Sequence, residues 1–308
     1  MEGIIQKVEE EAVHDGPGQR ALVFLKGCDL RCRWCQNPEL KKYEPRIWMH
    51  KTLCKACGAC EALCPVEGAI ERNLDGFIHR IDREKCLGYE CSKCLELCPG
   101  GLEIVGFKIT PQTLFEWLMK YEPFFEGTEG GVTLTGGDPL HVEEFSSAVL
   151  ALCQDASVHT AIETSLYSSY EELSRLATHC NLIMFDIKHM DSERHKWGTG
   201  VDNEQILENV RRLVDDFEGE LAVRVPLIPR FNDDEENIRK TAEFVAGLEK
   251  IKRFDLLPFN PLPIAKFSAL GMDWVYSGYE RQSDEYVDGL VDIVKSCGIE
   301  HCTTDGLW

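Results

Sequence analysis

Residues 25–39 read Leu-Lys-Gly-Cys-Asp-Leu-Arg-Cys-Arg-Trp-Cys-Gln-Asn-Pro-Glu. They continue an apolar run, residues 21–25, that is typical of a buried β-strand, so three thiols lie on the loop leaving the carboxyl end of that strand. Cys28, Cys32 and Cys35 can bind three irons of one iron-sulfur cube but cannot ligate the fourth. A metal with an open coordination position marks a catalytic site rather than a structural one. The stretch therefore predicts a catalytic cluster with one accessible iron.

This C-x3-C-x2-C spacing, with Trp34 before the last cysteine, resembles that of the radical S-adenosylmethionine (SAM) enzymes. Two neighbouring segments point to one group within these enzymes: residues 14–20, His-Asp-Gly-Pro-Gly-Gln-Arg, and residues 36–39, Gln-Asn-Pro-Glu. Together they resemble the activating enzymes of glycyl radical enzymes, over nearly the whole chain. The resemblance implies that SAM binds the open iron and is cleaved reductively to methionine and a 5′-deoxyadenosyl radical, which takes a hydrogen atom from a glycine of a partner glycyl radical enzyme.

The amino-acid composition indicates a globular protein and excludes some classes of function. The 308 residues are 44% hydrophobic and 28% charged, as in ordinary globular proteins, but the formal net charge is -20. Such an acidic chain is not expected to bind nucleic acid, and neither a signal peptide nor a membrane span is apparent. Fifteen cysteines without an export signal favour metal thiolates in a reducing cytoplasm over disulfides. We expect a cytoplasmic monomer.

Eight further cysteines form two runs, each ending in Cys-Pro. Cys54, Cys57, Cys60 and Cys64 match the spacing of bacterial ferredoxins, whereas the second run has two extra residues before its second cysteine. In two-cluster ferredoxins the last cysteine of each run serves the other cluster. One cube is therefore assigned to Cys54, Cys57, Cys60 and Cys98, and the other to Cys64, Cys86, Cys91 and Cys94. A pair of zinc sites is the alternative, less well matched by a tight triplet plus Cys-Pro.

The segment between the two runs predicts a β-hairpin with its turn near residues 73–76. Residues 49–106 are thus expected to form a ferredoxin-like insert. It would separate the start of a radical SAM barrel, residues 1–48, from the remainder, residues 107–308.

After residue 110 strand and helix patterns alternate, which predicts parallel strands joined by right-handed crossovers. The expected strands are 21–25, 131–135, 158–163, 182–188, 221–228 and 254–257, and the expected helices are 110–121, 142–153, 170–179, 203–217, 235–248 and 284–297. Six such strands are too few for a closed eight-stranded barrel. The fold class is therefore α/β, and the resemblance implies a partial (β/α)6 barrel. Residues 4–8 are expected to form a short edge strand.

Unusual residues recur at the expected carboxyl ends of these strands, where parallel α/β barrels place their chemistry. Gly136 and Gly137 permit close backbone approach to a ligand, and the resemblance implies that they and Asp138 hold the amino group of SAM. Lys188 could bind the SAM carboxylate, with an ion pair to Asp186 as the bland alternative, since both side chains share one face of the strand.

The resemblance supplies further roles at these strand ends. It implies contacts to SAM from Trp34, Glu163, Asp186, Arg224 and Asn260. Arg224 is the most distinctive of these, because an arginine within an apolar strand must meet an anion, with an acidic side chain of the protein itself as the alternative to SAM. In some members a monovalent cation is bound by residues that match Glu163, Thr164, Met184 and Asp186. Asp15 and Gly16 are expected to help receive the glycine loop of the partner.

The remaining histidines and cysteines carry no predicted chemistry. His189 and His195 lie in a charge-rich segment and are expected to be solvated. Cys153, Cys180, Cys297 and Cys302 lack metal-binding spacing and are expected to be small apolar fillers.

The function predicted is a radical SAM activase with three [4Fe-4S] clusters and SAM as cofactors, and flavodoxin or ferredoxin as electron donor. The partner is expected to resemble benzylsuccinate synthase or an arylacetate decarboxylase. Two alternatives stay open: a radical SAM enzyme that modifies a peptide or sulfatase, and a ferredoxin-like electron carrier.

Overall fold

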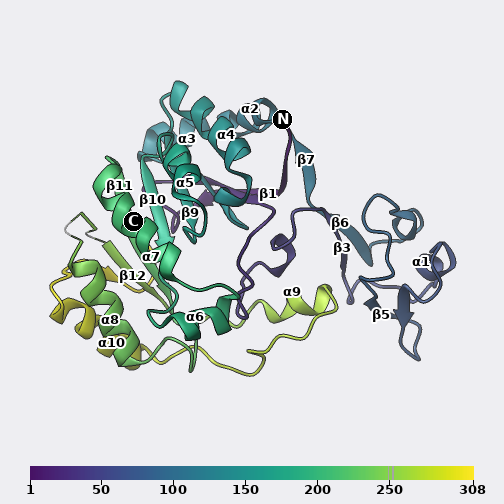
Figure 1. The fold of residues 1–308 in the computed structure, drawn as a ribbon. Coiled ribbons are helices and arrows are strands. Elements are labelled where there is room, and N and C mark those ends of the chain that lie inside the picture. Colours follow the sequence, from purple (N-terminus) through teal and green to yellow (C-terminus); the bar gives the residue numbers. More distant parts are fainter. Residues whose placement is uncertain (249, 252) are drawn as a thin grey trace.

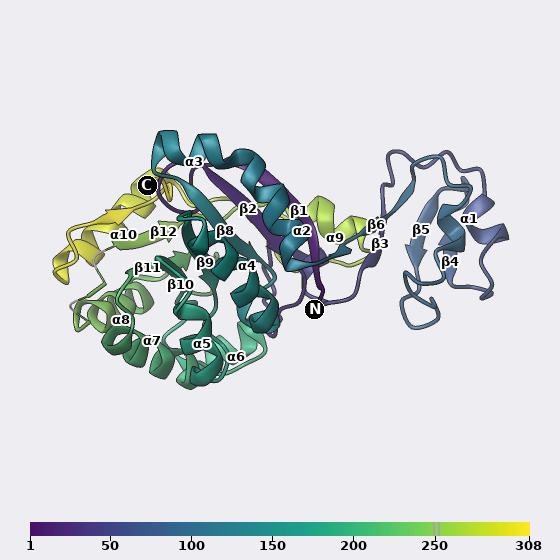
Figure 2. The ribbon, with the colours of Figure 1, turned by 90° about the horizontal axis from the view of Figure 1, so that it is seen from above.

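The computed structural model of the chain describes residues 1–248, 250–251 and 253–308. Within these residues the main sheet has nine strands, in the order β13-β12-β11-β10-β9-β8-β2-β1-β7. Neighbouring strands pair in parallel from β13 to β2, whereas β1 pairs antiparallel with both β2 and β7. The sheet curves into an open barrel with helices on its outside (Figures 1 and 2). The predicted α/β partial barrel is therefore confirmed.

The strands are β1 (Gly3–Ala12), β2 (Arg20–Leu25), β3 (Arg46–Met49), β4 (Ile70–Arg72), β5 (Ile78–Ile81), β6 (Leu102–Val105), β7 (Phe107–Ile109), β8 (Gly131–Gly136), β9 (His159–Thr164), β10 (Leu182–Asp186), β11 (Glu220–Pro226), β12 (Arg253–Leu257) and β13 (Cys302–Thr303). The α-helices are α1 (Ala59–Ala62), α2 (Pro111–Leu118), α3 (Glu122–Thr128), α4 (Glu143–Asp155), α5 (Tyr170–Ala177), α6 (Ser192–Thr199), α7 (Glu204–Asp216), α8 (Glu235–Ala246), α9 (Ile264–Ala269) and α10 (Asp284–Ser296). Short 3-10 turns are η1 (Pro38–Leu40), η2 (Lys93–Leu95), η3 (Met119–Tyr121) and η4 (Pro139–Val142).

Alternation along the strands separates the core from the barrel interior. Ile183 of β10 packs in the core with Leu173 of α5 and Val210 of α7. Leu182 and Met184 belong instead to a separate buried cluster against which Trp308 packs. Because alternate residues of a strand share a face, Asp186 at the end of β10 faces the same side as Met184. The barrel thus presents its strand-end polar groups inward.

Helix starts follow the capping residues in the sequence. Thr110 caps α2, with its hydroxyl accepting a hydrogen bond from the Thr113 amide and Pro111 at the first helical position. Ser169 and Glu172 form a reciprocal capping box at α5. Such caps fix where each crossover helix begins, and so how the preceding loop leaves its strand.

Residues 4–8 do form part of a strand, but the prediction of a short strand at the edge of the sheet was wrong. Strand β1 runs from Gly3 to Ala12 and pairs on both sides, with β7 forming the edge of the sheet. β7 is only three residues long and returns from the insert, so its pairing with β1 is a long-range contact that no local pattern reveals.

The insert projects to one side of the barrel (Figure 2). Strands β3 and β6 lead into and out of it as an antiparallel pair, with Met49 opposite Leu102. The predicted hairpin is present as β4 and β5. The Asn73 side chain accepts from the amides of Asp75 and Phe77 and so shapes its turn. Among the residues described, no helix is long and apolar enough to cross a bilayer.

Candidate active site

A cavity of about 370 Å³ opens at the carboxyl ends of the parallel strands. Every residue predicted to bind the catalytic cluster, SAM or the cation lines it: Cys28, Cys32, Trp34, Cys35, Gly136, Gly137, Asp138, Glu163, Thr164, Met184, Asp186, Lys188, Arg224 and Asn260. Thiols, carboxylates and cations from segments far apart in the chain therefore share one space. Asp15 and Gly16 are not among its lining residues.

The cysteine loop is held by backbone hydrogen bonds to neighbouring segments. The amide of Gly27 donates to the Leu40 carbonyl at 2.7 Å, and those of Arg31 and Arg33 donate to the carbonyls of Thr199 and Gly198. Burial raises the pKa of the Cys32 thiol to about 11. A thiol in such surroundings becomes a thiolate when a metal neutralises its charge, so the donor set fits an iron-sulfur cluster.

The Gly136–Asp138 turn packs directly on the cysteine loop. The amides of Gly137 and Asp138 donate to the carbonyls of Leu25 and Gly27, both at 2.8 Å. Gly136 has φ +103°, and a Cβ on Gly137 would lie 2.0 Å from the Gly27 carbonyl oxygen. Only glycines allow this turn to approach the loop so closely.

The carboxylate of Asp138 is buried and fully used within the fold. It accepts hydrogen bonds from the Thr164 hydroxyl at 2.8 Å, the Ser165 hydroxyl at 2.6 Å, and the amides of Ser165 and Leu140. These bonds tie the end of β8 to the end of β9. Asp138 therefore clamps the turn whose backbone faces the cavity.

Arg224 joins the cavity to the β1–β2 turn. Its guanidinium is buried, forms an ion pair with Glu163, donates to the His14 carbonyl, and lies 3.7 Å from Asp15 and 3.6 Å from Asp255. Burial raises the pKa of Glu163 to about 7, although the charge of Arg224 opposes that rise. The acidic partners of Arg224 were foreseen only as an alternative to a SAM contact.

Lys188 lies beside the cysteine loop and pairs with Asp186. Burial alone would lower the pKa of its ammonium group, but Asp186 and the neighbouring thiols raise it above the ordinary value. Lys188 is thus a buried cation at the wall of the cavity, in the ion pair that the i, i+2 spacing anticipated.

Three of the four residues expected to bind a cation have other partners in this structure. Glu163 pairs with Arg224, Asp186 pairs with Lys188, and the Thr164 hydroxyl donates to Asp138. Across the described part of the chain, no group of three or more His, Cys, Asp or Glu side chains is arranged to hold a single metal ion.

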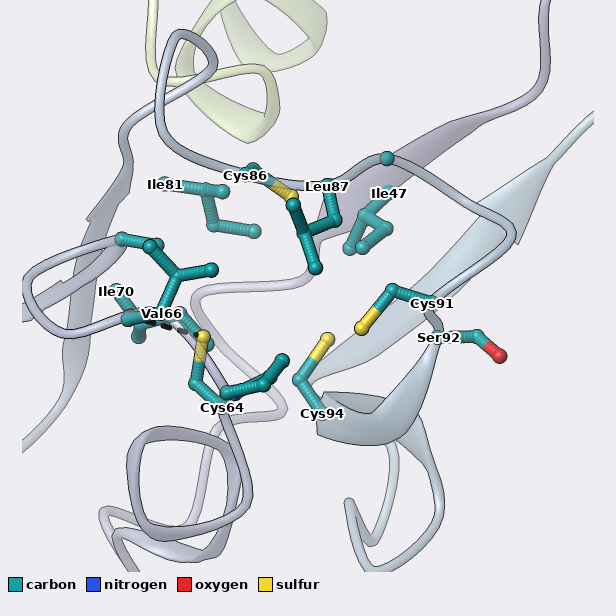
Figure 3. Close-up of a pocket in the computed structure, with 13 residues that line it drawn as sticks. Ile47, Cys64, Val66, Ile70, Ile81, Cys86, Leu87, Cys91, Ser92 and Cys94 are labelled. Carbon is teal, nitrogen blue, oxygen red and sulfur yellow. Dashed lines mark hydrogen bonds between the residues drawn. The ribbon is translucent and has the colours of Figure 1, made fainter.

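The insert gathers its eight cysteines into two groups of four. Figure 3 shows Cys64, Cys86, Cys91 and Cys94 around one cavity. The lining of a second cavity includes Cys54, Cys57, Cys60 and Cys98. In each group the fourth thiol comes from the other run of cysteines, the arrangement of a two-cluster ferredoxin. Aliphatic side chains such as Ile47 and Ile81 surround the first group.

The expectation for His189 and His195 was wrong. Both are buried: His189 accepts from the Asp191 amide through Nδ1, and Nδ1 of His195 lies 2.8 Å from the Val201 carbonyl. Burial lowers the pKa of His189 to about 4, so this ring is neutral near pH 7. A charge-rich sequence hid the fact that the loop before α6 turns the His189 ring inward and that α6 does the same with His195. Cys153 and Cys180 are buried in the core as expected.

Sequence reasoning missed a buried network below the cysteine loop. Lys26 is fully buried, its ammonium donates to the Glu39 carbonyl at 2.6 Å, and burial lowers its pKa to about 8. The Glu39 carboxylate is also buried and pairs with Lys266 of α9 at 2.7 Å. Glu39, the acid of the Gln-Asn-Pro-Glu segment, could have indicated a buried ion pair. Its partner Lys266, however, lies more than 200 residues away in the sequence.

Three family models match the chain: the radical SAM superfamily over residues 91–243, a 4Fe-4S dicluster domain over 46–99, and a 4Fe-4S single cluster domain over 14–70. Among solved structures, QueE from Escherichia coli has a TM-score of 0.50 at 13% identity, covering 99% of this chain and 95% of its own. SuiB of Streptococcus suis bound to its precursor peptide has a TM-score of 0.53 at 11% identity, covering 90% and 46%. At these identities the structures support the fold alone.

Curated relatives are similar over almost the whole chain. The (2S)-3-sulfopropanediol dehydratase activating enzyme of Klebsiella oxytoca is 35% identical, covering 97% of this chain and 96% of its own. The 4-hydroxyphenylacetate decarboxylase activating enzyme of Clostridioides difficile is 38% identical, covering 97% and 95%. The choline trimethylamine-lyase activating enzyme of Oleidesulfovibrio alaskensis is 36% identical, covering 91% of each chain. With its radical SAM and 4Fe-4S domains, the chain belongs to the activating enzymes of glycyl radical enzymes.

Proposed function

We propose that this activase binds SAM in the strand-end cavity, against a cluster held by Cys28, Cys32 and Cys35. The observation that carries this proposal is that three thiols share that cavity with Lys188 and the Gly136–Gly137 turn. The open iron would take the amino and carboxylate groups of SAM. When bound, cluster and SAM supply one-electron reductive cleavage of SAM and abstraction of a hydrogen atom from the partner's glycine.

The residues of the cavity orient the cofactor in this proposal. Lys188 meets the SAM carboxylate as a point charge and gives up part of its pairing with Asp186. The backbone of Gly136 and Gly137 faces the amino group. Trp34 and Asn260 line the side left for the adenosyl group, and the apolar ring of Trp34 helps to exclude water.

Glu163 and Arg224 form the boundary between the cavity and the turn that holds Asp15 and Gly16. We assign that turn to the partner's glycine loop, because Arg224 contacts it from the SAM side. A monovalent cation at Glu163, Thr164, Met184 and Asp186 would require Glu163 and Asp186 to exchange their present cationic partners for it. We therefore propose that this cation binds only when SAM is bound.

Three [4Fe-4S] clusters are proposed: the catalytic one and two in the insert, held by the two groups of four cysteines described above. The whole protein is proposed to act as a monomer that receives its electron from a flavodoxin or ferredoxin. For the partner, the arylacetate decarboxylase type has support from the 38% identity to the Clostridioides difficile activator. The benzylsuccinate synthase type rests on sequence segments alone.

The test combines cofactor cleavage with radical transfer. Reconstituted, dithionite-reduced protein should convert SAM to 5′-deoxyadenosine and methionine, and the Cys32→Ala variant should not. Incubation with candidate partner enzymes should then give the electron paramagnetic resonance doublet of a glycyl radical on one of them. Intact SAM in a fully clustered and reduced sample would overturn the proposal, whereas cleavage without any glycyl radical would overturn only the choice of partner.

A further inference from the structure

An exposed basic and aromatic face adjoins the cysteine loop. It is formed by Arg31 and Arg33 of that loop and by Arg194, Lys196 and Trp197 of α6, all five of them exposed. We refer to these five residues as the α6 face. The Trp197 ring is 55% exposed, and the Arg33 guanidinium lies 4.1 Å from its centre. Large apolar rings and arginines are the residues that interfaces favour.

The α6 face is connected directly to the catalytic cluster site. The amides of Arg31 and Arg33 donate to the last carbonyls of α6, so helix and loop form one surface. A row of aromatic rings leads inward from Trp197. The centre of the Phe231 ring lies 6.0 Å from that of Trp197 and 4.6 Å from that of Trp34. Trp34 lies between Cys32 and Cys35. A molecule on this face would be separated from the cluster only by the loop that binds it.

The cysteine-loop half of the α6 face carries a charge opposite to that of the protein as a whole. Residues 26–42 hold five Lys or Arg and two Asp or Glu, whereas the chain holds 33 and 53. Arg31 and Arg33 form no ion pair within the described residues, while Arg194 and Lys196 lie 3.7 and 4.0 Å from Asp234 and Asp202. The exposed acids beside them include Asp29, Asp191 and Glu193, so the α6 half of the face has mixed charge. The two unpaired arginines thus leave the cysteine loop basic.

The insert offers a weaker match to an acidic partner. Residues 49–106 hold seven Lys or Arg and nine Asp or Glu, and thiolate-bound clusters would add negative charge. Complementary charge speeds the encounter of proteins and aligns them, and like charge opposes it.

We propose that the α6 face docks the one-electron donor, a small carrier protein with an acidic surface. The inference rests on the proposed function, because it assumes a cluster at Cys28, Cys32 and Cys35. One electron would leave the reduced carrier, which is oxidised by one unit, and reduce that cluster directly, with no bond made or broken between the proteins. The insert is then not required for electron delivery. Small, salt-sensitive interfaces are typical of such transient redox encounters.

The experiment compares two reductants for the same reaction. SAM cleavage is measured with dithionite, and with a reduced flavodoxin as the acidic carrier, for wild type and for the Arg194→Glu/Lys196→Glu variant, whose two exposed side chains belong to α6 and not to the cysteine loop. We expect the flavodoxin-driven rate of this variant to fall about tenfold and its dithionite-driven rate to be unchanged. The matched control is Lys51→Glu/Arg80→Glu on the insert, which reverses two exposed charges that line neither cysteine cavity and should retain both rates.

The outcomes separate this inference from the proposed function. Loss of the flavodoxin-driven rate in the insert control, or its retention in the α6 variant, overturns the docking site. If the α6 variant loses the dithionite-driven rate as well, the single variant Lys196→Glu is measured instead, and an unchanged flavodoxin-driven rate at low salt then overturns the proposal. A wild type that cleaves no SAM with dithionite instead contradicts the proposed function.

Discussion

At the scale of single residues, we predict that Asp138 acts by holding the fold of the cavity rather than by binding the cofactor directly. Its buried carboxylate binds Thr164, Ser165 and the Leu140 amide. Asp138→Ala should leave these donors without an acceptor and lower the free energy of unfolding by about 3 kcal/mol, with weaker SAM binding as a consequence. Asp138→Asn, which keeps one acceptor oxygen, should lose less. Thermal unfolding and SAM titration measure both effects, and lost SAM affinity at an unchanged Tm would identify Asp138 as a direct ligand.

Glu163 should make stability depend on pH. Burial raises its pKa to about 7 in the folded protein, so between the ordinary carboxyl pKa and pH 7 the native state binds more protons than the unfolded state. By linkage, the contribution of Glu163 to stability is greatest at low pH and is lost as pH rises through 7. Glu163→Gln cannot titrate. The Tm of this variant relative to wild type should therefore rise from pH 5.5 to pH 8, and a constant difference would contradict the raised pKa.

The sequence alone was enough to predict the cluster ligands, but it was not enough to predict which polar side chains are buried. Cysteine spacing carries its meaning locally, because a cube demands thiols at short intervals. The burial of His189 and His195 depends instead on how α6 and the loop before it pack, and Glu39 depends on a lysine that only the folded chain brings near. Local sequence contains neither fact.

At the scale of elements, α9 fixes the cysteine loop from outside. Lys266 donates to the Asn37 side chain at 2.6 Å and pairs with the buried Glu39 carboxylate. Lys266→Met should cost about 3 kcal/mol of stability, because it leaves a buried charge without its partner. Adding Glu39→Gln should recover part of that loss, since it removes the stranded charge. Chemical unfolding of the cluster-loaded protein measures both variants, and additive losses in the double variant would show that the two groups are not coupled.

The alternating strands and helices were predictable, since each crossover repeats the same pattern. Short elements were not. Strands β7 and β13 and helix α9 are two to six residues long and are stabilised by contacts with distant segments rather than by their own periodicity. The β1 error has the same origin, because the extent of a strand is set by its neighbours in the sheet.

At the scale of the whole molecule, the barrel and the insert are joined by two strands. Met49 of β3 lies opposite Leu102 of β6, so residues 50–101 can in principle be replaced by an Asn-Gly turn that closes a hairpin. Figure 1 shows these strands as the link between the two parts. Every residue that lines the strand-end cavity lies outside the removed segment.

We expect this shortened protein to fold and to bind about four irons in place of about twelve, because eight of the eleven suitably spaced thiols are removed. Met49 and Leu102 lose apolar neighbours in the insert, so some stability is lost. Dithionite-driven SAM cleavage should persist, and Cys32→Ala in the same background should abolish it. If the donor docks on the α6 face, flavodoxin-driven cleavage should persist too. A shortened protein with four irons that cleaves SAM only with dithionite would instead show that electrons arrive through the insert.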